Sequence, residues 1–216
     1  MDLTRSLATQ IVATYSTVSQ PPFLVAICGW ADTGKSTLAN SLCASLVRMG
    51  VSVDRLSTDA FLKSRSERNA HGHTGNNYLS IDRAAIRDCV ASILNRQVFT
   101  YYPYENRTGC RAVNPVTLSP QSVVVVEGIH AFHPAVSKAL HLRVFIDSDE
   151  STLRAMRARA NVSKRGMSVV DSHARIDKEW EDYRAFTLPL KSQADLLVKV
   201  STEFEYSVWP GGASDA

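Results

Sequence analysis

The chain has 216 residues and a mass of 23.8 kDa, which is enough for one domain with a substantial core. Apolar residues make up 44% and charged residues 21%, so disordered and fibrous classes are excluded. The net charge of +3 is too small to indicate a nucleic-acid-binding protein, which needs basic residues gathered on one face.

The cysteine spacing and the N-terminus indicate the compartment. The four cysteines are widely spaced and include no CxxC pair, which argues against a zinc knuckle and a disulfide framework and favours a reducing environment. No apolar run reaches the roughly 18 residues of a membrane helix. The first residues include Asp2 and Arg5 and lack the apolar segment of a signal peptide. We expect a soluble cytoplasmic protein that binds neither nucleic acid nor membrane.

The first half of the chain alternates between helical and extended patterns. The apolar spacing predicts a helix over 2–18, ended by the Gln20-Pro21-Pro22 break, and a second helix over Lys35–Met49 with Gly50 as its stop. A third helix is predicted over Ile81–Leu94. The continuous apolar run Phe23–Cys28 predicts a strand buried on both faces, and Val51–Ser57 is a second strand candidate.

The second half continues the alternation. Two extended arms, Val98–Tyr102 and Arg111–Val116, surround a polar turn and predict a hairpin over 98–116. Strands are predicted at Val123–Val126, Leu142–Ile146 and Asp195–Val200, helices at 149–164 and 171–186, and a flexible tail at 210–216. Alternating strands and helices predict a single α/β domain over 1–216 with a five-stranded parallel sheet and helices on both faces.

Residues 29–36, Gly-Trp-Ala-Asp-Thr-Gly-Lys-Ser, match GxxxxGK[ST], the P-loop motif, between a predicted strand and a predicted helix. The glycines let backbone N–H groups face phosphates, and the helix N-terminus adds positive potential. Lys35 would reach the β- and γ-phosphates and Ser36 would bind magnesium. The expected nucleotide-binding residues are Gly29, Ala31, Asp32, Thr33, Gly34, Lys35, Ser36 and Thr37. A glycine turn before a helix is the structural alternative.

Two acids follow predicted strands. Glu127 comes at the end of the Val123–Val126 run, at the sheet edge where ligands of parallel sheets gather, so we expect it in the magnesium shell. Asp59 follows Val51–Ser57 and would take a proton from an attacking hydroxyl, with Phe61 walling the pocket. The alternatives are structural, since either acid could cap the next segment.

The segment 63–80 is rich in Arg, His, Gly and Asn and lacks a hydrophobic period. A loop this long is usually functional, and whether it binds substrate or only covers the site stays open. His71 and His73 flank Gly72, but without further ligands they favour surface positions over a metal site.

Four blocks together resemble the uridine kinase / phosphoribulokinase branch of the P-loop kinases. They are GWADTGKST at 29–37, STDAF at 57–61, YYPYENRTG at 101–109 and VVVVEGIHAF at 123–132. The segments 145–166 and 188–198 are similar to that family's strand with an Arg-rich lid and to its last helix and strand, so the resemblance covers 23–200.

The resemblance implies a fold like that of nucleoside and NMP kinases, with the hairpin over the acceptor and a lid at 150–170. It implies an ATP-dependent kinase that uses Mg²⁺ and phosphorylates a hydroxyl of a small metabolite. Lys35 and the lid arginines Arg157 and Arg165 would act with Asp59 in catalysis, whereas Arg154 and Arg159 are better explained as solvated helix residues. Ser36, Glu127 and Asp59 would serve the metal. Phe61, Tyr78, Tyr104, Arg107 and His130 would bind the acceptor.

Three acceptor positions depart from the uridine kinase pattern. Gly109 stands where a base-reading histidine is expected, Tyr78-Leu79 where a Phe-Asp pair binds ribose, and Met167 where an arginine is typical. The departures indicate the same reaction on a different alcohol. The arginines Arg65, Arg68, Arg107 and Arg111 hint at an anionic acceptor, although exposed arginines are common.

The alternative function is a module that binds and slowly hydrolyses ATP to switch a protein partner. The intact Asp59, the lid arginines and the hairpin favour the kinase, because a switch does not need them. The family also suggests a homo-oligomer, on which the sequence pattern itself is silent.

Overall fold

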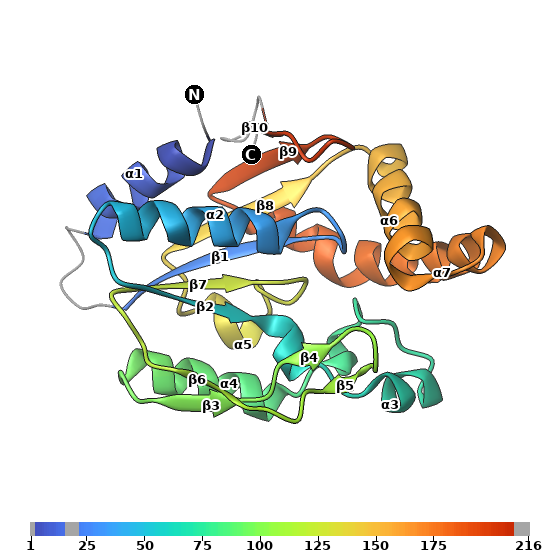
Figure 1. The fold of residues 1–216 in the computed structure, drawn as a ribbon, viewed down its shortest axis with the longest axis horizontal. Coiled ribbons are helices and arrows are strands. Elements are labelled where there is room, and N and C mark those ends of the chain that lie inside the picture. The colour runs from blue at the N-terminus through green and yellow to red at the C-terminus, as the bar shows by residue number, and fades with distance from the viewer. Residues whose placement is uncertain (1–2, 16–21, 210–216) are drawn as a thin grey trace.

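Five parallel strands form the centre of the molecule (Figure 1), whose computed structural model describes residues 3–15 and 22–209. The order across the sheet is β9-β8-β1-β7-β2, so the first strand lies in the middle. This confirms the predicted parallel α/β sheet. The strands are β1 (Phe23–Gly29), β2 (Val53–Ser57), β7 (Val123–Glu127), β8 (Leu142–Asp147) and β9 (Leu196–Val200).

A sixth strand, β10 (Tyr206–Val208), extends the sheet and corrects the predicted count of five. It runs antiparallel to β9, with Val208 opposite Val198. The chain reverses in a turn in which Phe204 has a φ of 63° and donates its N–H to the Ser201 carbonyl at 3.0 Å. A three-residue edge strand in a polar stretch is too short to show a period of two, which is why the sequence pattern misses it.

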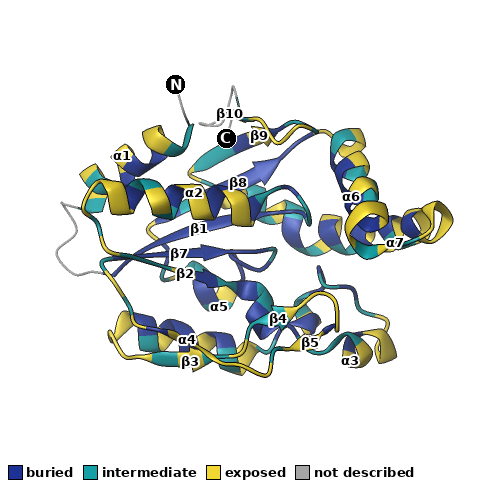
Figure 2. Ribbon diagram, in the orientation of Figure 1, coloured by how far each residue is buried: buried dark blue, intermediate teal, exposed yellow. Residues whose placement is uncertain are grey.

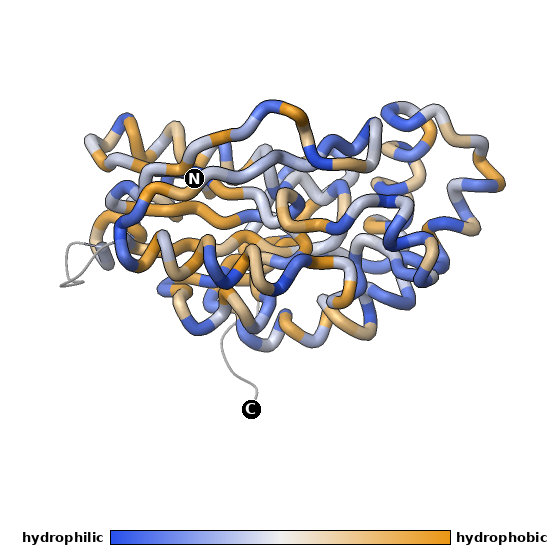
Figure 3. The backbone as a smooth tube through the Cα atoms, turned by 90° about the horizontal axis from the view of Figure 1, so that it is seen from below, coloured by the Kyte–Doolittle hydropathy of each residue, from blue (hydrophilic) through white to orange (hydrophobic). Residues whose placement is uncertain are grey.

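Helices cover both faces of the sheet, as the continuous apolar strands require. On one face α1 (Leu3–Tyr15) and α2 (Lys35–Arg48) pack on Phe23, Val25 and Ile27. The alternate residues of β1 belong to the other face, which α4 (Arg83–Leu94) and α7 (Val169–Asp182) cover. Figures 2 and 3 show the central strands as the buried, hydrophobic layer. The predicted end of the first helix, 16–18, lies outside the described residues, as does the tail 210–216.

The hairpin region is built from two short ladders. The strand β3 (Phe99–Tyr101) pairs with β6 (Val116–Leu118), and β4 (Tyr104–Glu105) pairs with β5 (Cys110–Arg111) nearer the tip. The second arm thus reaches two residues past the expected boundary at 116.

The segment 63–80 is not an irregular loop throughout, which corrects the sequence-based expectation. It contains α3 (Arg65–Ala70), capped by the Ser64 hydroxyl, and a 3₁₀ turn at Tyr78–Ser80. The Arg65 N–H donates to the Gly109 carbonyl at 2.7 Å, so α3 is attached to the hairpin. A six-residue helix offers too few turns to display a hydrophobic period.

Beyond β7, the short α5 (Pro134–Ser137) precedes β8, and α6 (Glu150–Arg165) begins at the cap residue Asp149. The chain turns at Gly166 into α7, which continues as a π-helical turn, Tyr183–Thr187, and a 3₁₀ stretch, Leu188–Gln193. Figure 1 shows α6 and α7 together at the end of the sheet toward which β1 and β8 point. Within the described ranges, no helix combines the length and apolar character needed to cross a membrane.

Candidate functional site

Three chain segments with chemical groups meet at the carboxyl edge of the sheet. The P-loop follows β1, Glu127 ends β7 and Asp59 follows β2, and these three strands are neighbours. Glu127 lies opposite Ile27 on one side and Ser57 on the other. A cleft of about 500 Å³ opens here. Its lining includes Ala31, Asp32, Gly34, Lys35, Ser36, Thr37, Asp59, Arg65, Arg68, Asn76, Tyr104, Asn106, Glu127, Arg157, Lys164, Arg165, Arg175, Glu179 and Phe204.

The P-loop leaves the start of α2 facing this cleft. Gly34 precedes the helix with a φ of 79°, which glycine adopts without strain, and no side chain caps the helix. A Cβ at Gly34 would also collide with the Tyr206 hydroxyl, which donates to the Gly34 carbonyl at 3.1 Å. The first N–H groups of α2 are therefore available to an anion such as a phosphate.

Two of the expected nucleotide-binding residues, Gly29 and Thr33, support the conformation of the P-loop. Gly29 lies against the backbone of Ile146, where a side chain would not fit, and the buried Thr33 hydroxyl donates to the Trp30 carbonyl at 2.8 Å. Neither lines the cleft. Trp30 itself packs edge-on against Trp180 of α7, with ring centroids 4.8 Å apart. The loop is thereby anchored in the core.

Lys35 is buried, and its ammonium donates to the Trp30 carbonyl. Burial lowers the pKa of Lys35, while the nearby carboxylates Glu127 and Asp59 act to raise it. In the described part of the chain, no carboxylate lies within ion-pair distance of the ammonium. The charged form of Lys35 is therefore favoured by acids that lie beyond ion-pair distance, Glu127 and Asp59.

The acids and Ser36 form an oxygen-rich group. Ser36 Oγ donates to Glu127 Oε2 at 3.1 Å, and Glu127 is 3% exposed. Burial, and then the charge of Asp59, raise the pKa of Glu127. Burial also raises the pKa of Asp59, against the opposing charges of Lys35 and Arg68. Two neighbouring carboxylates with raised pKa values favour a bound cation, and Arg55, at 4.0 Å from Glu127, is the one ion-pair partner of these two acids among the described residues.

Asp59 is not a helix cap. It lies inside the 3₁₀ turn Thr58–Phe61, whose first flanking residue is Ser57, and its partly buried side chain lines the cleft. The geometry therefore leaves the Asp59 carboxylate available for chemistry, in contrast to Asp149, whose carboxylate accepts from Thr152 at the start of α6.

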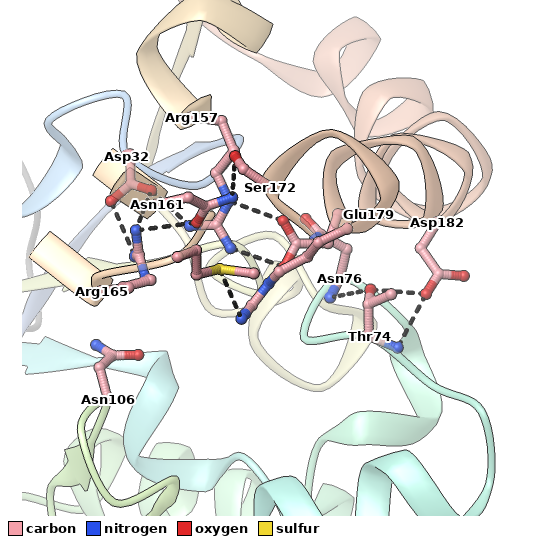
Figure 4. Close-up of polar contacts among 12 residues, drawn as sticks. Asp32, Thr74, Asn76, Asn106, Arg157, Asn161, Arg165, Ser172, Glu179 and Asp182 are labelled. Carbon is pink, nitrogen blue, oxygen red and sulfur yellow. Dashed lines mark hydrogen bonds and ion pairs between the residues drawn. The ribbon is translucent and has the colours of Figure 1, made fainter. Parts of the chain in front are cut away.

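The lid arginines converge on the P-loop (Figure 4). Arg157 donates to Glu179 of α7 through Nε and Nη2, both at 2.7 Å, and to Asp32 through Nη1. Arg165 also donates to Asp32, at 3.1 and 3.2 Å. Burial opposes the ionised form of Asp32, but Arg157 and Arg165 lower its pKa on balance. Positive charge from α6 is thus held directly beside the phosphate-binding loop.

The other two arginines of α6 point elsewhere. Arg154 pairs with Glu150 at 2.7 Å and Asp177 at 2.6 Å, and Arg159 donates to the Thr202 carbonyl at 3.0 Å. Neither lines the cleft. This agrees with the interpretation of Arg154 and Arg159 as solvated helix residues, since Arg154 is partly exposed and Arg159 is exposed.

Of the five expected acceptor residues, Tyr104 lines the cleft and the other four do not. Phe61 is buried against Tyr101, with ring centroids 6.4 Å apart. His130 is buried and bonded to the Gly75 carbonyl at 2.8 Å. Both side chains are thus packed beneath the site and do not face the cleft.

The remaining two expected acceptor residues, Tyr78 and Arg107, also lie outside the lining of the cleft. Tyr78 packs on His133 and Phe186, with centroids 5.1 and 5.3 Å away. Arg107 is exposed at the hairpin tip, where its neighbour Asn106 reaches the cleft instead. Arg111 does not line the cleft either; it pairs with Asp82, the cap residue of α4, at 3.3 Å and lines a separate cavity there.

Several cleft residues were not singled out from the sequence, notably Asn76, Lys164, Arg175, Glu179 and Phe204. Arg175 and Glu179 have the i, i+4 spacing of a helical ion pair, and their Nε–Oε1 distance is 2.8 Å. That spacing could have marked the pair, but only the packing of α7 on α6 brings it to the site. Asn76 and Phe204 carry no local signal.

Solved structures of low sequence identity share this fold. A putative fructose transport system kinase from Silicibacter sp. TM1040 matches with a TM-score of 0.77 and 19% identity, over 91% of this chain and 99% of that one. D-glycerate 3-kinase from Cryptococcus neoformans matches with a TM-score of 0.73 and 15% identity, over 97% of this chain and all of the other (100%).

Sequence comparison gives the family. A uridine kinase from Leuconostoc citreum is 25% identical over 186 residues, which is 82% of this chain and 87% of that protein. The family model described as "Phosphoribulokinase / Uridine kinase family" matches residues 24–206, most of the chain. The protein therefore belongs to the phosphoribulokinase / uridine kinase family of P-loop kinases.

Proposed function

We propose that this protein is a Mg²⁺-requiring kinase that transfers the γ-phosphoryl group of ATP to a hydroxyl of a small metabolite. The observation that carries the proposal is the position of Asp59. A carboxylate with no capping role lines the same cleft as Lys35 and the N-terminus of α2. A general base beside a phosphate cradle is the arrangement that phosphoryl transfer to an alcohol needs.

The nucleotide phosphates would bind the first N–H groups of α2 and the Lys35 ammonium, which leaves the Trp30 carbonyl to meet them. The residues present fit Mg²⁺, because Ser36 and Glu127 offer hard oxygen ligands. Among the described residues there is no group of three or more His, Cys, Asp or Glu that would form a metal cage. A site that relies on one or two carboxylates is typical of Mg²⁺ bound together with phosphates, where the ion neutralises charge on the transferring group.

In the transfer itself, the acceptor oxygen forms a bond to the γ-phosphorus. The bond from that phosphorus to the bridging β–γ oxygen breaks, and its electron pair leaves with ADP. The hydroxyl proton passes to the Asp59 carboxylate and then to water. The raised pKa of Asp59 makes it a stronger base than an exposed aspartate. Arg157 and Arg165, already gathered at Asp32, supply the positive charge that a loose phosphoryl transition state requires.

The acceptor is a nucleoside or another small alcohol or sugar. The relatives carry names that span these classes, including uridine kinase and D-glycerate 3-kinase. Because Tyr78 and His130 lie outside the lining, they would shape the pocket from behind, whereas Tyr104 and Asp59 would meet the acceptor.

The test is ADP formation from Mg-ATP against a panel of nucleosides, sugars, sugar phosphates and small hydroxy acids. One acceptor class should raise the rate well above the rate without acceptor, and Asp59→Asn should abolish that increase while ATP still binds. A flat panel together with tight ATP binding would overturn the kinase proposal and favour a nucleotide-dependent switch.

A further inference from the structure

Arg68 is a buried cation whose bonds are all to neutral groups. It is 8% exposed, its Nε donates to the Lys63 carbonyl at 3.1 Å and its Nη2 donates to the Tyr104 hydroxyl at 2.5 Å. Its guanidinium also lies 5.6 Å from the centroid of the Tyr104 ring. Among the ion pairs of residues 3–15 and 22–209, none includes Arg68.

This arrangement is unusual for an arginine, because the guanidinium keeps its charge in proteins and buried charges are normally paired. Arg157 shows the normal case, since it is similarly buried and bonds two carboxylates, Asp32 and Glu179. Arg68 also has five N–H groups, and those on Nη1 make no hydrogen bond within the described chain. It therefore has both unmatched charge and free donors.

The free donors belong to the acceptor half of the cleft. Arg68 lines that cleft together with Arg65, whose Nη2 donates to the Asn106 carbonyl and which is likewise without an acidic partner in the part of the chain described. The acid that the charge of Arg68 influences is Asp59. That charge acts to lower the pKa of Asp59, although the two side chains form no ion pair. One wall of the pocket is thus a base and another is a pair of cations.

Asn76 adds a second, independent sign of a ligand. The residue is 2% exposed and lines the cleft, and its side-chain oxygen is buried with no hydrogen-bond partner. An unsatisfied buried acceptor costs about 1–3 kcal/mol, so such atoms usually have a role. Asn76 thus adds an unfilled hydrogen-bond acceptor to the residues that line the same cleft.

We propose that the acceptor carries a carboxylate or phosphate group that binds Arg68, with Arg65 beside it, while the hydroxyl to be phosphorylated faces Asp59. This inference rests on the proposed kinase function and specifies its substrate class. Carboxylate and phosphate are the groups that the planar fork of an arginine binds with two hydrogen bonds. A neutral nucleoside would leave the Arg68 charge buried and unmatched.

The first experiment compares pairs of acceptors in which one member carries an added anionic group. Phosphoryl transfer from Mg-ATP is measured with glycerol against glycerate and with fructose against fructose 6-phosphate, with uridine as a neutral nucleoside. The anionic member of at least one pair should have a kcat/KM about tenfold or more above its neutral partner, the scale of a charge-assisted hydrogen bond. The two pairs distinguish a carboxylate from a phosphate. Preference for the neutral members, or uridine as the best acceptor, would overturn the proposal and leave the kinase function standing.

Three variants of the pocket arginines test whether these residues cause the preference for anionic acceptors. Arg68→Gln and Arg65→Gln should each reduce the ratio of anionic to neutral turnover, and Arg68→Lys should retain part of it because the charge remains. Arg111→Gln removes the same charge from outside the cleft, where Arg111 pairs with Asp82. The ratio should be unaffected in that control. A ratio that does not change in Arg68→Gln and Arg65→Gln would contradict the assignment.

Calorimetry separates failure of this proposal from failure of the kinase function. Glycerate and fructose 6-phosphate are titrated into the protein loaded with Mg²⁺ and a non-hydrolysable ATP analogue. If nothing in the panel is turned over, the kinase function fails. Binding of either anion that is lost in Arg68→Gln would then still support an anion site, and the absence of binding would reject it.

Discussion

Arg157 of α6 and Asp32 of the P-loop form an ion pair in which both side chains are nearly buried, at 5% and 12% exposure. The same guanidinium bonds Glu179 of α7 through two nitrogens. One side chain therefore connects the phosphate-binding loop with two helices that lie far from it in sequence. Arg165 adds a second connection to Asp32, so the lid segment is fastened to the P-loop by charge.

Replacing Arg157 should be costly for both stability and activity. Arg157→Gln leaves two buried carboxylates with one arginine partner each, Asp32 with Arg165 and Glu179 with Arg175. The expected loss of unfolding free energy is roughly 3 kcal/mol, the scale for breaking a buried pair. Turnover should fall as well, because positive charge beside the phosphates is lost. Urea unfolding at pH 7 measures the first effect and ADP formation the second.

Arg154→Gln is the matched control for that experiment. Arg154 lies on the same helix and pairs with Glu150 and Asp177, but these partners are more than half exposed. Solvent-exposed pairs contribute about 1 kcal/mol or less. Equal losses of unfolding free energy in the two variants would show that the buried ion pairs around Asp32 stabilise the protein no more than exposed ion pairs do.

Asp59→Asn should separate stability from function. Burial raises the pKa of Asp59 in the folded protein, so its contribution to stability is fully present below the unfolded pKa near 3.8 and is lost as the pH rises through the raised folded value. The variant does not ionise and escapes this loss. Without nucleotide and Mg²⁺ it should be about 1 kcal/mol more stable than the native protein at pH 7, with little difference at pH 3.5.

The same variant should reduce turnover by about 100-fold or more, the usual scale for a lost general base. The native enzyme should show an acidic limb in its kcat/KM profile above the ordinary aspartate range, since the base must be ionised. Full activity in Asp59→Asn would remove Asp59 from the mechanism, and a lower stability at pH 7 would contradict the raised pKa of Asp59.

Lys35→Ala should weaken ATP binding itself. The ammonium is the one buried lysine charge that lines the described cleft, and it is held on the Trp30 carbonyl until phosphates replace that partner. Titration of the protein with ATP, followed by calorimetry, measures the affinity. Lys164→Ala provides the comparison, because Lys164 lines the cleft from an exposed position at the end of α6 and should matter much less. Retained affinity in Lys35→Ala would contradict the proposed role of the P-loop.

The centre of the sheet was predictable because β1 and β7 are continuous apolar runs bounded by turn residues, which are typical of strands covered on both faces. Asp59 and Glu127 were predicted at one site for a second reason, because adjacent parallel strands have their carboxyl ends at the same edge of the sheet. The rule does not extend to β10, an antiparallel edge strand with two exposed residues, which belongs to the sheet through its pairing with β9.

Side-chain partnerships were less predictable because they depend on contacts between distant segments. Asp32 was expected to serve the nucleotide, yet it lies 125 residues before the arginine that it bonds. Arg68 and Arg107 both occur in polar stretches, and the sequence gives no reason to rank them. The fold buries Arg68 under the hairpin through Tyr104 and leaves Arg107 exposed at the tip.

His130 should make the stability of the protein depend on pH. The ring is fully buried, its Nε2 is bonded to the Gly75 carbonyl, and burial lowers the pKa of His130 to about 4. Since the unfolded chain binds a proton near pH 6.5, the stability present above that pH is lost as the pH falls toward 4. Between pH 7 and pH 5 this group alone should account for about 2 kcal/mol.

His130→Gln tests this linkage, because the amide can still donate to the Gly75 carbonyl but does not titrate. Urea unfolding at pH 7, 6 and 5 should give a shallower decline for the variant than for the native protein, whatever the difference between them at pH 7. The pKa of His133 is also lowered to about 4, by burial and then by the charge of His130, so the decline that His133 contributes is present in both proteins and is smaller in the variant. Parallel declines would mean that His130 is already protonated in the fold, and that the Gly75 carbonyl stabilises the charged ring.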